Sequence, residues 1–259
     1  MIRSLQTWLA ISAALALASC AGAPPLPPPP VHANGQALWR IVHDQCVPGQ
    51  RSKGDPSPCA LVSMTDGEAH GFVLLKDRKG ATQYLLMPTA RITGIEDPAL
   101  LAHDEVNYFA EAWDERGHVQ DRLNRRLDRT QISVAVNSVY GRSQDQLHLH
   151  IDCLDRSVEA ALAAVDVPAD GRWTPIQLKG RRYRVRWLGA DALPSDQPFK
   201  LLAQEIPGAR RDMGGWTLAL VGARRPSGAQ GYYLLADRAD PLAGDPGSAE
   251  ELQDHACRL

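Results

Sequence analysis

The stretch QDQLHLHIDC, residues 144–153, decides how the rest of the chain is interpreted. Side chains alternate between the two faces of a β-strand. As a strand, this stretch has one apolar face, formed by Leu147, Leu149 and Ile151. The opposite face carries a polar row: Gln146, His148, His150 and Asp152. Two neighbouring imidazoles repel each other once protonated and are unusual on a plain solvated face, so the row indicates a functional site.

The overall composition limits the class of protein. The chain has 259 residues, of which 44% are hydrophobic, which is enough to bury an ordinary core. Its length suits one elaborated domain or two fused halves. The formal net charge is −2 and the isoelectric point is near 6.4. Because there is no basic field, nucleic acid is not an expected partner.

The N-terminus has the features of an export signal. Arg3 precedes an apolar run over residues 8–18, which is too short for a typical membrane span. The run ends in Leu-Ala-Ser-Cys at 17–20, which resembles a bacterial lipoprotein processing box. Residues 1–20 are therefore predicted to be a signal and Cys20 a lipidation site, with an uncleaved anchor helix as the alternative. The Pro-rich residues 21–33 are predicted to be an extended tether, which leaves 34–259 as the folded domain.

Four further cysteines lie in the domain. An even number in an exported chain suggests two disulfides, and the sequence alone leaves three pairings open. Cys46 and Cys59 bracket a Pro/Gly-rich loop, residues 47–58, that is expected not to order itself and would gain from a local disulfide. Cys153 and Cys257 then remain to pair with each other. A zinc site is the rival interpretation, which the lack of any C-x-x-C pair disfavours.

Apolar spacing predicts the elements of the first half. Helices are expected at 34–46 and from Asp97-Pro98 to about Arg126, the latter interrupted at Gly117. Strands are expected at 71–77, 83–89, 131–136 and 146–153, the first two joined by a turn at 78–80. This β-β-α-β-β order predicts an α+β fold, in which a helix packs on an antiparallel sheet.

The second half repeats this layout faintly. Strands are expected at 181–189 and 199–206, and residues 216–238 resemble 131–153 as strand, glycine-containing loop, strand. In this alignment His148 falls on Tyr233, and 136–137 falls on 221–222. We hypothesise a degenerate internal duplication with halves of about 34–160 and 161–259 and chemistry in the first only. The alternative is the general likeness of any two hairpins.

Arginines alternate along one strand of the second half. Arg182, Arg184 and Arg186 fall on one face of the strand 181–189. Their guanidinium groups suit a pyrophosphate or acidic lipid headgroups. A solvated edge strand protected by charge explains them equally well, so they are left out of the catalytic set.

The polar row resembles the signature of the histidine-triad superfamily. That signature places three histidines at alternate positions of a strand, after an upstream asparagine and a loop containing glycine and serine. Here Asn137 and the loop 141–144 (Gly-Arg-Ser-Gln) precede the row, and Gln146 replaces the first histidine. The resemblance implies a histidine-triad-like antiparallel sheet with packed helices. The replaced position is a supporting one, so the nucleophile is retained.

Several separated blocks resemble the CDP-diacylglycerol pyrophosphatase family, a membrane-attached branch of that superfamily. The resemblance covers residues 38–259 and includes all four domain cysteines. The matching blocks are CVPGQ, DPSPCALV, GFVLLKD, QYLLMPTARITGIEDPALL, NSVYGRSQ, HLHIDC and ELQDHAC. It implies hydrolysis of CDP-diacylglycerol to CMP and phosphatidate without a cofactor or metal. It also implies a periplasm-facing protein anchored in the inner membrane, with membrane phospholipid as a partner; Ala21 after Cys20 carries no inner-membrane retention signal, so the outer membrane stays open.

The resemblance assigns roles to the polar row. His148 is expected to attack the cytidylyl phosphorus and form a nucleotidyl-histidine intermediate, which suits imidazole because it is neutral near its ordinary pKa. His150 is expected to donate to a phosphate oxygen or to the leaving group. The residues expected to bind the substrate are Asn137, Gly141, Ser143, Gln144 and Gln146.

Two rival functions stay open at this point. His-x-His on a strand is also a metal-ligand arrangement, so a metal-dependent hydrolase is one rival. The missing first histidine favours the other, a lipid-anchored module that binds a nucleotide or lipid without turnover. The motifs do not determine base specificity, lipid specificity or oligomeric state.

Overall fold

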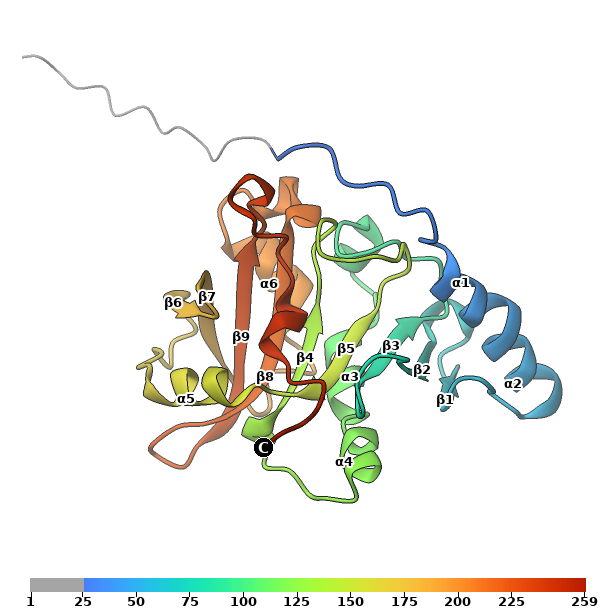
Figure 1. Cartoon of the computed structure of the whole chain (residues 1–259), viewed down its shortest axis with the longest axis horizontal. Helices are drawn as coiled ribbons and strands as arrows, with labels where there is room; N and C mark the ends of the chain where they lie inside the picture. Colours follow the sequence, from blue (N-terminus) through green and yellow to red (C-terminus); the bar gives the residue numbers. More distant parts are fainter. Residues whose placement is uncertain (1–25) are drawn as a thin grey trace, which may run out of the picture.

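The strand predicted from the polar row lies near the centre of a nine-stranded antiparallel sheet (Figure 1). The computed structural model describes residues 26–259, so the predicted signal, Cys20 and the first residues of the tether lie outside the described residues. The strand order is β1-β2-β3-β5-β4-β8-β9-β7-β6. The strands are β1 (Leu61–Ser63), β2 (Phe72–Lys76), β3 (Tyr84–Pro88), β4 (Ile132–Val136), β5 (Leu149–Cys153), β6 (Thr174–Leu178), β7 (Arg181–Gly189), β8 (Trp216–Arg224) and β9 (Gln230–Arg238).

Of the helices in residues 26–259, two precede β1, and the others lie in the connections between the strands. The helices are α1 (Ala37–Ile41), α2 (Val47–Lys53), α3 (Tyr108–Asp114), α4 (Gly117–Leu123), α5 (Arg156–Ala164) and α6 (Pro198–Glu205). A π-helical turn, Val42–Cys46, joins α1 to α2. The fold is therefore mixed, with a large antiparallel sheet and a few helices, as the α+β prediction required.

The two halves of the sheet have the same order of elements. The strands run β2-β3-β5-β4 on one side and β8-β9-β7-β6 on the other, and β4 pairs with β8 between them. Along the chain each half reads β-β-α-β-β, with α3 before β4 and α6 before β8. The hairpin β4–β5 thus lies directly beside the hairpin β8–β9.

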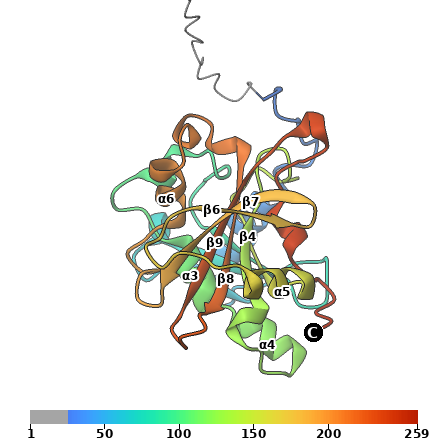
Figure 2. The same cartoon turned by 90° about the vertical axis from the view of Figure 1, so that its left-hand side faces the viewer.

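One face of the sheet is covered by α3 and α6 (Figure 2). Phe109 of α3 and Phe199 of α6 pack against each other with ring centroids 5.1 Å apart. They share one core with Leu149 and Ile151 of β5, which confirms the predicted apolar face. Burial of this apolar area is the main favourable contribution to folding.

The opposite face is covered by α5 and by residues 246–257, here called the C-terminal segment (Figure 2). The amide of Gln253 bonds the carbonyl of His150 at 3.0 Å, and the backbone of Asp254 donates to the carbonyl of Cys153. The polar row is therefore buried beneath this segment, not open to solvent along its length.

Both predicted disulfides are present. Cys46 pairs with Cys59, and Cys153 pairs with Cys257. The first ties α2 and its loop to the edge of the sheet, and the second fixes the C-terminal segment to β5.

Three predicted elements differ from the structure. Residues 199–205 lie in helix α6 and not in a strand, because Phe199, Leu202 and Ala203 are all buried and have helical spacing. The loop after Cys46 is ordered as α2, where Pro48 occupies the first turn and needs no backbone donor.

The long helix predicted over 97–126 is also wrong in its extent. A 3-10 turn, Pro98–Leu101, is capped by Asp97, and the chain then extends before α3 begins after its own cap, Asn107. The predicted break at Gly117 marks the start of α4.

The tether residues that the structure describes lie along the end of the sheet where β4 leads into β5 (Figure 1). The hydroxyl of Tyr140 donates to the carbonyl of Pro27, and Leu26 lies against Gly215. Within residues 26–259, no helix combines the length and the apolar character that a membrane crossing requires.

Candidate active site

The candidate site is built around the two histidines of the β5 stretch. His148 immediately precedes β5, and His150 is its second residue. Leu149 between them packs into the core under α3, so alternation turns both imidazoles to the other face. Their rings lie side by side with centroids 4.9 Å apart and planes inclined by 65°.

The backbone holds His148 in one tautomer. Its Nδ1 lies 2.6 Å from the carbonyl oxygen of Gln146, and a carbonyl can only accept. Nδ1 therefore carries the proton and donates it, while Nε2 keeps a lone pair. Burial lowers the pKa of His148, so the ring is neutral at neutral pH. This is the form that nucleophilic attack requires.

His150 takes the opposite tautomer. The side-chain nitrogen of Gln83 lies 3.1 Å from His150 Nδ1 and 3.3 Å from Glu250 Oε1. Since the carboxylate only accepts, the group facing both atoms is the amide NH₂, assigned from this network. His150 Nδ1 is then an acceptor, and its proton sits on Nε2, 3.6 Å from Glu250 Oε2.

The His150–Glu250 contact joins a neutral ring to a carboxylate. Burial lowers the pKa of His150 to about 3, because the cost of burying the charged ring outweighs the opposing effect of Glu250. At neutral pH the contact is therefore between a neutral imidazole and a carboxylate, and it is not an ion pair. Glu250 stabilises the tautomer of His150 that carries its proton on Nε2, although at 3.6 Å the two atoms form no hydrogen bond.

An ion-pair network of His255, Asp152 and Glu250 completes this face of the site. His255 lies between two carboxylates, with Nδ1 2.8 Å from Asp152 and Nε2 3.3 Å from Glu250. Hydrogen bonds to Asp152 and then to Glu250 raise the pKa of His255 to about 9, so it is an imidazolium at neutral pH. Thr82 donates to the far oxygen of Asp152 at 2.6 Å.

Glu250 is held in the ionised form. Its burial alone would raise the pKa, but hydrogen bonds from His255, Asn137 and Gln83 outweigh that effect. The pKa of Glu250 therefore lies well below its usual range. The site thus has a fixed negative charge beside His150, neutralised on its other side by His255.

Asn137, predicted to bind substrate, holds the C-terminal segment. Its amide nitrogen donates to Glu250 Oε2 at 3.1 Å, and its oxygen accepts from the Ser248 hydroxyl and the Glu250 backbone. Gly141 touches the same segment, because a Cβ there would approach the carbonyl of Gly247 to 2.9 Å. Both residues therefore lie at the junction between the predicted loop and the segment.

The other predicted binding residues are spread around the row. Gln146 is fully buried and donates to the carbonyls of Pro88 and Ala90 at 2.9 and 3.0 Å. Gln144 accepts from the backbone of Leu38, so it faces α1. Ser143 is exposed at the loop surface.

Cations surround the site without pairing to its histidines. Arg142 is buried and forms two hydrogen bonds with Glu96, at 2.6 and 2.7 Å, and its charge contributes to the lowered pKa of His148. Arg91 is exposed and donates to the side-chain oxygen of Gln146 at 3.3 Å. Lys79 is near enough to affect the pKa of His150.

The residues that sequence reasoning missed are Gln83, Glu250 and His255. Each is polar and lies far from the histidines in sequence, so no local pattern marked them. One signal was present: the predicted Cys153–Cys257 disulfide places His255 beside the strand that carries Asp152.

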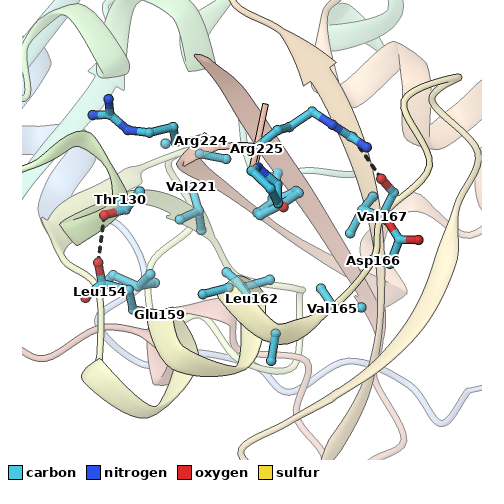
Figure 3. A pocket seen from close by; sticks show the side chains of 16 residues that line it. Thr130, Leu154, Glu159, Leu162, Val165, Asp166, Val167, Val221, Arg224 and Arg225 are labelled. Carbon is cyan, nitrogen blue, oxygen red and sulfur yellow. Dashed lines mark hydrogen bonds between the residues drawn. The ribbon is translucent and has the colours of Figure 1, made fainter. Parts of the chain in front are cut away.

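A separate hollow of about 500 Å³ lies between α5 and the hairpin β8–β9 (Figure 3). Tyr233, which the hairpin alignment matched to His148, lines it together with Leu162, Val221 and Arg225. None of its lining residues belongs to the histidine site, and none is a histidine. This hollow therefore lacks the groups from which the candidate site is built.

Two of the three arginines in the predicted row are exposed. Arg186 is buried and paired with Glu205, whereas Arg182 and Arg184 are exposed and line a larger hollow. Their strand β7 lies between β9 and β6, so it is not an edge strand. Among residues 26–259, no three His, Cys, Asp or Glu side chains are grouped as metal ligands.

Comparison with known proteins identifies the family. The model of the CDP-diacylglycerol pyrophosphatase family matches residues 33–259. The chain belongs to the CDP-diacylglycerol pyrophosphatase family. A CDP-diacylglycerol pyrophosphatase from Yersinia pestis is 46% identical over 228 residues, which cover 87% of this chain and 85% of that protein. The matched region of this CDP-diacylglycerol pyrophosphatase family member includes the histidine pair and the C-terminal segment.

Proposed function

We propose that this protein hydrolyses the pyrophosphate bond of CDP-diacylglycerol to CMP and phosphatidate through a nucleotidyl intermediate on His148. Family membership supports the substrate and the enzyme class. The observation that carries the mechanism is the Nδ1–H of His148 on the Gln146 carbonyl, which leaves the Nε2 lone pair free.

In the first step Nε2 of His148 forms a bond to the cytidylyl phosphorus, and the bond from that phosphorus to the bridging oxygen breaks. Phosphatidate leaves with the electron pair; a phosphate monoester has a second pKa near 6, so no proton transfer is needed. The ring becomes cationic, and the Gln146 carbonyl stabilises its Nδ1–H. The Nε2–H of His150 has no hydrogen-bond partner among the described residues, so it is available to donate to a phosphate oxygen.

In the second step water attacks the same phosphorus. The new P–O bond forms as the P–N bond breaks, His148 recovers its lone pair, and the proton of the water passes to solvent. Glu250 keeps His150 aligned through both steps, and His255 prevents Glu250 from taking up a proton. Phosphoryl transfer depends largely on such positioning.

The loop 137–144 is proposed to place the pyrophosphate. Asn137 and Gly141 set the distance between this loop and the histidines by packing on the C-terminal segment. Ser143 and Gln144 lie farther along the same loop, where their polar groups suit a phosphate or ribose. Gln146 acts by fixing the backbone carbonyl that orients His148.

The fold is proposed to be histidine-triad-like and to derive from an internal duplication. The matched β-β-α-β-β order of the halves supports this origin. The alignment needs one adjustment, because Val136 and Val221 belong to cores on opposite faces of the sheet. Lipidation at Cys20 and attachment on the periplasmic side of a membrane are also proposed; two disulfides are compatible with an oxidising compartment.

The decisive experiment is mass spectrometry of the enzyme quenched during turnover of CDP-diacylglycerol. We expect a cytidylyl adduct on His148 and release of CMP. His148→Ala should lose at least about 10³-fold in turnover, and His150→Ala about 10²- to 10³-fold. Near-normal CMP release by His148→Ala, or an adduct elsewhere, would refute the assignment. Binding of CDP-diacylglycerol with no CMP formed would favour the binding module, and loss of activity on chelation would favour a metal-dependent hydrolase.

A further inference from the structure

The end of the molecule that carries the tether also carries a large hollow of about 1580 Å³. We define the tether-side face as the exposed surface around this hollow: Leu26–Pro29, Arg182, Arg184, Arg211 and Leu242. Tyr140 from the loop of the candidate site lines the same hollow and bonds Pro27. The face therefore adjoins the loop through which we expect the pyrophosphate to be placed.

An isolated apolar side chain projects from this face. Leu242, in the 3-10 turn Pro241–Ala243, is 89% exposed. Val31 in the tether is 97% exposed, and these two are the exposed large hydrophobic residues among those described. A single exposed apolar side chain is common on protein surfaces, but its position among exposed arginines matches the composition of surfaces that meet a bilayer.

The charges of the face leave an excess of cations. Arg182, Arg184 and Arg211 are exposed and form no ion pair with any residue in the described part of the chain. Their positive field therefore remains available to an external anion.

The carboxylates around the hollow are largely compensated. Asp212 pairs with Arg238, and Asp245 lies 3.7 Å from Arg181. Burial and the neighbouring Asp245 raise the pKa of Asp237 to about 7, so it is partly protonated at neutral pH. Asp240 is exposed and caps the turn that carries Leu242. The face thus complements an anionic surface.

The tether limits how far this face can lie from an anchor. Leu26 follows Cys20 by six positions, and a fully extended chain spans at most about 3.6 Å per residue. An acyl group on Cys20 would therefore keep Leu26 within about 22 Å of the bilayer.

We propose that the tether-side face rests on an anionic phospholipid bilayer, with Arg182, Arg184 and Arg211 on lipid phosphates and Leu242 in the apolar layer. This inference rests on the proposed function, because a diacylglycerol nucleotide must be taken from a bilayer. The contact would place the loop 137–144 above the membrane surface, where the pyrophosphate of an embedded substrate lies.

The test uses the full lipidated chain in vesicles of phosphatidylcholine with about one third phosphatidylglycerol. An environment-sensitive fluorophore is attached at Leu242→Cys, and lipids brominated on their acyl chains serve as quenchers. We expect a blue shift and strong quenching at position 242. The matched control label at Arg126→Cys, exposed after α4 at the far end of the sheet, should stay unquenched.

A second arm removes the charges. The triple variant Arg182→Gln, Arg184→Gln, Arg211→Gln should show at most half of the quenching of wild type. At low salt, each of the three substitutions should contribute a loss of about fivefold or more to the turnover of bilayer-embedded substrate. High salt should abolish the difference, since screening shortens to about 3 Å at 1 M. Turnover in neutral detergent micelles should be unchanged, as should every readout for Arg125→Gln with Arg126→Gln.

The outcomes separate this inference from the proposed function. An unquenched label at 242 in protein that still releases CMP would overturn the docking face alone. A quenched label in protein that releases no CMP would support the face and overturn the proposed function. Equal quenching in pure phosphatidylcholine would show that the anionic charge has no role and would also overturn the proposal.

Discussion

His148 and His150 are separated by one residue, yet they carry their protons on opposite ring nitrogens. The difference comes from their partners: a backbone carbonyl for His148, and the Gln83 amide with Glu250 for His150. One ring can therefore attack while the other donates. A single strand provides both roles because the surrounding side chains differ.

Glu250 allows a sharp test at this scale. Glu250→Gln removes the charge that orients His150, so turnover should fall about 10- to 100-fold with little change in the Michaelis constant. Glu251→Gln is the matched control, because Glu251 bonds Tyr183 instead of the histidines. Steady-state kinetics with CDP-diacylglycerol measures both. Equal effects of the two substitutions would remove Glu250 from the mechanism.

Among the elements, most of the sheet was predictable and most of the site's surroundings were not. Strands β2, β3, β4, β7, β8 and β9 follow their apolar patterns closely. Residues 199–206 were misassigned because a short apolar segment suits either period until its burial is known. Glu250 and His255 could not be inferred locally, since their roles depend on a fold that brings residues a hundred positions apart together.

The two disulfides provide a contrast between elements. Replacing either pair by alanines should destabilise the protein by about 2–5 kcal/mol, measured by urea unfolding. Only the Cys153/Cys257 pair fixes the segment that carries Glu250. At temperatures where both variants remain folded, only the loss of this pair should therefore lower turnover. The Cys46/Cys59 variant, altered at the sheet edge, serves as the control. Full activity in the Cys153/Cys257 variant would show that noncovalent contacts alone hold the segment.

For the whole molecule, the shifted pKa values of His255 and His150 predict that the free energy of unfolding depends on pH. The raised pKa of His255 contributes stability that is present below its ordinary value of 6.5 and is lost as pH rises through about 9. His150, with its pKa lowered to about 3, costs stability as pH falls below 6.5, because the unfolded ring then binds a proton that the folded ring does not. Free energies of unfolding from pH 4 to 10 should show both limbs.

His255→Gln isolates the alkaline limb. The difference in unfolding free energy between wild type and this variant should shrink between about pH 7 and pH 10. A constant difference across that range would mean that His255 is not charged in the folded protein.

The proposed lipid anchor can also be tested on the whole molecule. Cys20→Ser should abolish lipidation, and the intact mass of wild-type protein should lack residues 1–19 and include acyl chains. Detergent partitioning of wild type compared with the variant provides an independent measure. Wild-type protein that retains residues 1–19 would contradict the predicted processing.

The docking of the C-terminal segment across β5 also sets when activity can begin. Ribosomes make the histidine strand about a hundred residues before Glu250 and His255. A nascent chain therefore contains His148, the proposed nucleophile, before it contains Glu250 and His255. In the proposed mechanism the site is therefore complete only when the last-made residues have closed over the strand.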